Sequence, residues 1–114
     1  MRAGRRLPKK RLPDEESELL RRVNDERSPD KARLDALSLL EGSYRVPDAE
    51  VARILVSLLD DHSKTLRGNA FVSLRYYTGL SLPYDVNAPS KGARSWTKWA
   101  KGLGKKYAFP RPRF

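Results

Sequence analysis

The 114-residue chain contains no cysteine. This absence excludes a disulfide framework, a thiolate nucleophile and a cysteine-containing zinc site, and it is typical of a reducing compartment, so we expect a cytoplasmic protein. Long apolar runs are also absent, since no segment approaches the roughly 18 apolar residues of a membrane span. The basic start of the chain leads into acidic residues without the apolar stretch of an export signal. We therefore expect neither a membrane span nor a cleaved signal.

Histidine occurs once, at position 62, in the run Asp60-Asp61-His62-Ser63. Consecutive residues in a turn rarely converge on one substrate, and Ser63 is better explained as the cap of a following helix. A metal site would need more histidine or a better carboxylate cluster. The run "KGLGKK" lacks the strand and spacing of a phosphate-binding loop. We therefore expect a protein that is not an enzyme, with no cofactor, no metal and no small-molecule substrate.

Acidic residues are absent from both ends of the chain. Residues 1–13 carry six basic side chains and residues 91–114 carry eight, whereas residues 14–90 have a net charge of −4. Charges segregated in this way are typical of arms that bind a polyanion, and solubility tails are the alternative. The division predicts a basic N-terminal arm (1–13), a helical domain (14–101) and a basic tail rich in aromatic residues and proline (102–114).

The middle of the chain has helical apolar spacing and no strand alternation, so we predict an all-α fold. The first helix follows "DEESELLRRVNDER". The second has Ser28 as N-cap, Pro29 in the first helical position and Gly42 just past its end. The third buries one face, and the fourth runs from Lys64 to Thr78 between the cap Ser63 and the stop Gly79. The predicted buried face of the third helix consists of Val51, Ile54, Leu55, Leu58 and Leu59.

These helices form two similar pairs, because matching residues such as Arg33 and Arg67 lie 34 positions apart. A period in this range marks a helical repeat. The stretch "VARILVSLLDDHSKTLRGNAFVSLRYYTG" resembles the HEAT-repeat family, in which an acid in the turn precedes an arginine and small residues; Asp61, Arg67 and Ala70 stand in those places. The segment "YYTGLSLPYDVNAPSKGARSWTKWA" is similar to the close of bacterial HEAT-like proteins. The resemblance covers roughly residues 14–100.

The resemblance implies a short repeat of two antiparallel helix pairs plus a C-terminal capping helix, acting as a scaffold or recognition module. It does not identify the ligand. It further implies structural roles for Asp61 and Arg67, because the acid and the arginine of the family hydrogen-bond within or between neighbouring repeats. The position that matches Asp61 in the first pair holds Arg27. We therefore expect Arg33 to lack an acid and to be available for a ligand.

Trp96 and Trp99 are three residues apart and share one face if a helix begins near Pro89. Because the last pair of a repeat needs a cover for its apolar face, we predict that both indoles are structural and cap it. Stacking on exposed bases is the alternative. In the tail, alternating prolines and arginines favour an extended conformation. Tyr107 and Phe109 could anchor it by stacking or by insertion into a pocket.

The charge division predicts a non-catalytic protein that binds RNA or associates with a ribonucleoprotein particle such as the ribosome. A HEAT-like adaptor for a protein partner and a non-specific DNA-binding protein are the alternatives. The candidate nucleic-acid contacts are basic residues of both arms and the last helix, together with Arg33 and Tyr107. They are Arg2, Arg5, Arg6, Lys9, Lys10, Arg11, Arg33, Lys98, Lys101, Lys105, Lys106, Tyr107, Arg111 and Arg113.

Overall fold

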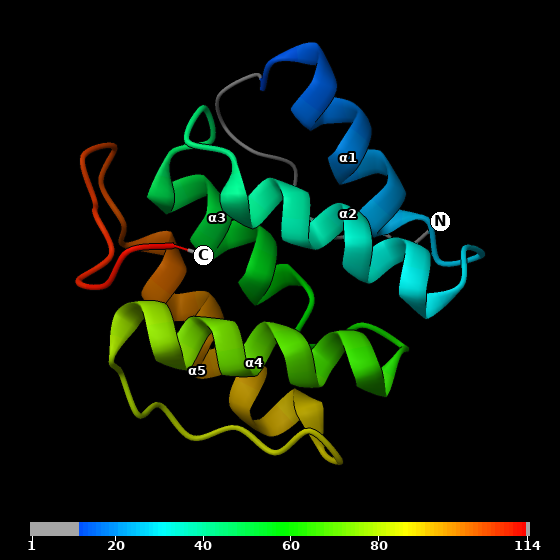
Figure 1. The fold of residues 1–114 in the computed structure, drawn as a ribbon. Coiled ribbons are helices and arrows are strands. Elements are labelled where there is room, and N and C mark those ends of the chain that lie inside the picture. Colours follow the sequence, from blue (N-terminus) through cyan, green and yellow to red (C-terminus); the bar gives the residue numbers. More distant parts are fainter. Residues whose placement is uncertain (1–11, 114) are drawn as a thin grey trace.

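The computed structural model describes residues 12–113, and this part of the chain contains five α-helices and no β-strand (Figure 1). The all-α prediction is confirmed for these residues. None of the described helices is long and apolar enough to cross a membrane. The helices are α1 (Asp14–Asn24), α2 (Asp30–Gly42), α3 (Asp48–Ser57), α4 (Lys64–Thr78) and α5 (Pro89–Lys101).

α1 and α2 pack against each other as an antiparallel pair. Near the start of α1 and the end of α2, the Ser43 hydroxyl donates a hydrogen bond to the Glu16 carboxylate (2.7 Å). At the opposite end of the pair, Arg33 Nε donates to the Val23 carbonyl oxygen (2.7 Å). The start of one helix therefore lies beside the end of the other.

α2 and α4 run side by side in the same direction (Figure 1). At their starts, the Ser63 hydroxyl donates to Asp30 Oδ1 (2.9 Å). At their ends, the Tyr77 hydroxyl donates to Glu41 Oε1 (2.5 Å). The second helix pair therefore repeats the direction of the first.

α3 lies at the centre of the molecule, with α4 and α5 packed against it. Residues 49–56 are all buried, and the five residues predicted for its buried face are between 0% and 3% exposed. The predicted burial of these five residues is confirmed, whereas burial of the helix is not confined to one face. The last two of them, Leu58 and Leu59, lie just beyond the end of the helix.

The helix ends agree with the sequence at α4 and differ at α2. The Ser63 hydroxyl accepts a hydrogen bond from the Leu66 N–H (3.2 Å), and Gly79 has a φ of 70°, so both predicted ends of α4 are confirmed. In α2, Ser28 is not the cap: Pro29 occupies that position without a side-chain cap hydrogen bond, and the Ser28 hydroxyl donates to Asp25 Oδ2 (3.0 Å). Pro29 is extended, with a ψ of 150°, and α2 continues through Gly42.

The tail after α5 folds back onto the helices. Phe109 is 8% exposed, and its ring stacks on Tyr77 with 4.9 Å between centroids and 24° between planes. Its backbone N–H donates to Asp48 Oδ2 at the start of α3 (2.8 Å). Residues 102–113 form no helix or strand, and the buried ring of Phe109 attaches them to the helical domain by stacking, one of the two modes that the sequence left open.

Aromatic rings in contact link this tail to the helices. Successive ring centroids lie between 4.8 and 6.4 Å apart, the range in which aromatic pairs attract each other. The loop after α4, α4, α5 and the tail are therefore held together by one aromatic row. In order of contact it consists of Tyr84, Phe71, Trp96, Trp99, Tyr107, Phe109, Tyr77 and Tyr76.

Candidate nucleic-acid interface

The outward side of α5 carries a row of basic side chains. Lys91, Arg94, Lys98 and Lys101 follow the i, i+3, i+7, i+10 spacing that places residues on one side of a helix. All four are exposed, and at 1.5 Å per residue the row extends for about 15 Å. We call these four residues the α5 ridge.

The opposite side of α5 is buried and holds the helix in place. Gly92, Trp96 and Ala100 form this buried side, and Trp96 is 0% exposed. The Trp96 ring meets Phe71 of α4 at 84° and Trp99, which is half-buried, at 85°. Trp96 thus lies where the predicted capping role requires it. The burial of this side directs the α5 ridge into solvent.

Gly92 sets how closely the loop after α4 approaches α5. A Cβ atom at this position would lie 2.4 Å from Tyr84 Cα and 2.5 Å from the Pro83 carbonyl oxygen. The loop backbone therefore crosses directly over the glycine. The Tyr84 hydroxyl of this loop donates to the carbonyl oxygen of Leu59, which follows α3 (2.5 Å), and so ties the loop to the core.

Basic side chains continue beyond the α5 ridge. Lys105 and Lys106 lie exposed in the turn that follows α5, and Arg111 is exposed further along the tail. The chain contains no acidic residue after Asp85. We call the α5 ridge together with Lys105, Lys106 and Arg111 the basic surface.

Several cations of α1 and α2 have carboxylates beside them, whereas Lys64 and Arg75 of α4 are exposed without an ion pair in the described part of the chain. Arg21 and Arg22 of α1 lie 2.9 and 3.9 Å from Glu18, and Lys31 of α2 lies 3.1 Å from Asp35. Within residues 12–113, no such ion pair involves the seven residues of the basic surface. Their charge is therefore not offset by a neighbouring acid of the described chain.

Arg33 does not belong to this surface, and the expectation that it is available for a ligand is wrong. Its side chain is fully buried, with Nη1 and Nη2 donating to the two carboxylate oxygens of Asp61 at 3.0 and 2.7 Å. Asp61 lies in the turn of the second pair, so the acid of one pair serves the arginine of the pair before it. The sequence interpretation considered an acid only within the helix pair of Arg33, whereas the acid comes from the next pair.

Arg67 is occupied by backbone carbonyl groups. Its guanidinium donates to the carbonyl oxygens of Asp61 (2.8 Å), His62 (3.2 Å) and Val86 (3.1 Å). These contacts tie the start of α4 to the turn before it and to the loop after it. Arg67 thus lies where its expected structural role requires it.

Two candidate residues of the tail are engaged within the protein. Arg113 lies 3.0 Å from Asp48 and donates to the Val46 carbonyl oxygen (2.7 Å), so its guanidinium is paired within the protein. Tyr107 is half-buried between Trp99 and Phe109, and burial raises the pKa of its hydroxyl. Neither residue is included in the basic surface.

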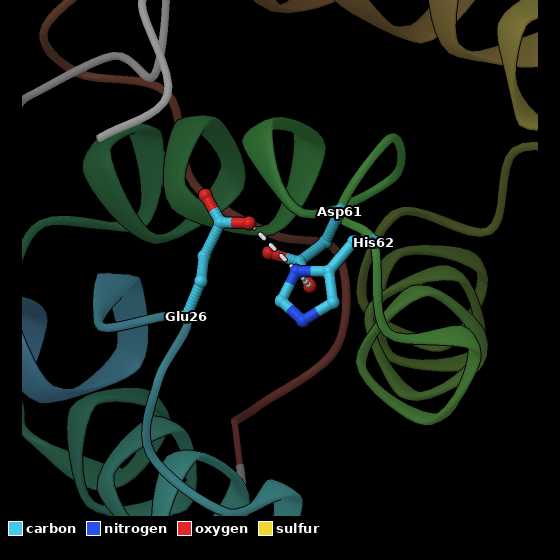
Figure 2. Close-up of side chains that lie close together, drawn as sticks. All are labelled: Glu26, Asp61 and His62. Atoms are coloured by element: carbon cyan, nitrogen blue, oxygen red, sulfur yellow. Dashed lines mark hydrogen bonds and ion pairs between the residues drawn. The ribbon is translucent and has the colours of Figure 1, made fainter.

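Glu26, Asp61 and His62 form the one described cluster whose atoms could converge on a metal ion (Figure 2). His62 Nδ1 lies 2.6 Å from Glu26 Oε1 and 3.6 Å from Asp61 Oδ2. Both oxygens of Asp61 already accept hydrogen bonds from Arg33. The cluster is therefore explained as a contact between the first and second helix pairs.

The six predicted contacts of the N-terminal arm lie outside the described residues: Arg2, Arg5, Arg6, Lys9, Lys10 and Arg11.

Comparison with known proteins found no matching family model, no matching curated protein and no matching solved structure.

Proposed function

We propose that this protein binds RNA, without catalysing a reaction, as a component of a cytoplasmic ribonucleoprotein particle. The observation that carries the proposal is the α5 ridge, whose four cations face solvent without a carboxylate of the described chain beside them. Cations arranged in this way neutralise phosphates and release the counterions condensed on a nucleic acid, which favours binding. The six basic residues of the N-terminal arm add to the same interaction.

We also propose that the two helix pairs are HEAT-like repeats. The parallel course of α2 and α4 supports this, as does the Arg33–Asp61 ion pair, which joins one helix pair to the next. In this arrangement α5 and the tail close the open end of the stack. The helical core then serves as a rigid support for the basic surface.

The proposal is tested by measuring the affinity of the protein for a short single-stranded RNA at increasing salt concentration. Replacing the four residues of the α5 ridge by glutamine removes four phosphate contacts. At about 0.7 counterions per contact, the slope of log affinity against log salt should become shallower by roughly 3. Fluorescence anisotropy of a labelled RNA gives both the affinity and the slope.

A matched variant controls for net charge. Replacing Arg21, Arg22, Arg27 and Lys31 by glutamine removes the same number of exposed cations from α1, α2 and the loop between them, three of them close to Glu18 or Asp35. This variant should keep the affinity and the slope of the parent. Equal losses in the two variants would mean that net charge, and not the α5 ridge, governs binding.

Other outcomes select the other functions. Tighter binding to DNA than to RNA of the same sequence would replace RNA by DNA in the proposal. Failure of the full chain to bind either nucleic acid at low salt would overturn it and favour an adaptor for a protein partner.

A further inference from the structure

Arg111 is held in place by the residues on either side of it. Phe109, two residues before it, is buried and bonded through its N–H to Asp48. Arg113, two residues after it, pairs with the same Asp48 and donates to the Val46 carbonyl oxygen. The chain around Arg111 is thus fixed at two points on the start of α3, while the Arg111 side chain is exposed.

The Arg111 guanidinium lies over an aromatic ring at the surface of α4. Its Cζ atom is 5.0 Å from the centroid of Tyr76, which is 38% exposed. The next residue, Tyr77, is fully buried and hydrogen-bonded to Glu41, so the backbone that carries Tyr76 is anchored in the core. Arg111 and Tyr76 therefore present a guanidinium positioned over a ring, and the backbone on both sides of this contact is anchored.

The local sequence limits the motion of Arg111 further. Pro110 and Pro112 flank it, and each has a fixed φ. Side chains that are already ordered before binding lose less conformational entropy when a ligand arrives. A planar guanidinium stacks well on flat π systems, including RNA bases, whereas a lysine ammonium does not.

We propose that the Arg111–Tyr76 pair is a stacking platform for a base of single-stranded RNA, which lies against the exposed side of the guanidinium. This inference rests on the proposed function, because it assigns the RNA to single strands with accessible bases. Bases in a duplex are stacked on one another and cannot reach such a platform. The other cations of the basic surface contact phosphates and do not distinguish bases.

A simple anchoring role for the Arg111–Tyr76 contact is the competing explanation. The tail, however, is already attached by the buried ring of Phe109 and by the Arg113–Asp48 ion pair. The contact between Arg111 and Tyr76 adds a third attachment between exposed groups. If the contact is a stacking platform, a substitution at Arg111 weakens the binding only of a ligand that has bases. If the contact is only an anchor, the substitution affects ligands with and without bases alike.

The experiment compares two ligands of equal length and charge, an oligoadenylate and the same ribose-phosphate chain without bases. Arg111→Lys keeps the charge and removes the planar group. It should weaken oligoadenylate binding by roughly 5- to 100-fold, the range of one lost base stack, and leave binding of the abasic chain within about twofold. Tyr76→Leu should have the same selective effect.

Arg75→Lys is the matched control, because Arg75 is also exposed on α4 and lies over a ring, that of Phe71, at 5.6 Å. Its effect on both ligands should be small. Circular dichroism should show unchanged helicity and melting for the Arg111 variant.

Three results would overturn the platform. They are an unchanged oligoadenylate affinity in Arg111→Lys, an equal loss for both ligands, or an equal loss in Arg75→Lys. Failure of the parent protein to bind either ligand would instead overturn the proposed function.

Discussion

Removing the carboxylate of Asp61 should strongly destabilise the fold. Both Asp61 and Arg33 are 0% exposed, and Arg33 donates two hydrogen bonds to the carboxylate and one to the Val23 carbonyl oxygen. Asp61 Oδ2 also accepts the Ser63 N–H at 2.9 Å. In Asp61→Asn, the guanidinium stays buried without its counter-charge and faces an amide N–H₂ group across one of its bonds.

The expected cost is about 3–5 kcal/mol, the usual range when one partner of a buried ion pair is removed. A domain of this size is stable by roughly 5–15 kcal/mol, so the loss is a large share of the total. It should lower the melting temperature by more than about 10 °C. Replacing both members by apolar residues, Arg33→Met with Asp61→Leu, should cost less than the sum of the single changes, because no buried charge is then left alone.

Urea unfolding of Arg33→Met, Asp61→Leu, the double variant and the parent measures this coupling, and Asp61→Asn is measured beside them. The Lys31–Asp35 pair of α2 is the control, because its side chains are 87% and 67% exposed and its loss should cost less than about 1 kcal/mol. Suppose instead that Asp61→Asn stays within about 1 kcal/mol of the parent and Arg33→Met loses RNA affinity. The buried pair would then be refuted, and Arg33 would be a ligand contact after all.

Three further predictions test other parts of the fold. Gly92→Ala should destabilise by roughly 1–3 kcal/mol, because the new Cβ would lie 2.4 Å from Tyr84 Cα, whereas Gly104→Ala, with nothing within 4 Å, should be neutral in thermal melts. Burial raises the pKa of Glu41 above its ordinary value of 4.5, so its carboxyl lowers stability as pH rises from about 4.5 through the folded-state pKa. Glu41→Gln should flatten the stability–pH profile over this pH range, and at higher pH it should be more stable than the parent. An unchanged profile would contradict the pKa shift. Phe109→Ala should cost about 3–5 kcal/mol in urea unfolding, and a negligible cost would show that the tail is free.

The helices could be predicted because their signals are local. The apolar spacing of α3, the serine cap of α4 and the left-handed Gly79 each act within a few residues of the chain. Backbone preferences and short-range hydrogen bonds dominate at that scale. The start of α2 differs from the prediction locally, since Pro29 and not Ser28 occupies the N-cap position.

The charge division of the chain predicted two of the four residues of the α5 ridge. Lys98 and Lys101 were candidates from the sequence, whereas Lys91 and Arg94 were not. The helical spacing of all four was a signal that could have identified them, because the side opposite a buried tryptophan faces solvent. The way the tail is anchored stayed open between stacking and insertion into a pocket, because nothing local reveals that Phe109 contacts Tyr77.

The amino-acid sequence by itself determined the helices, their apolar sides and the absence of acids from the ends of the chain, since each depends on neighbouring residues. Tertiary structure alone decided which charges remain available for a ligand. The buried Arg33 pairs with Asp61, 28 residues after it, and Arg113 pairs with Asp48, 65 residues before it. Such pairs form because burying a guanidinium requires an acceptor, and the acceptor comes from whichever segment the packing of the helices brings beside it.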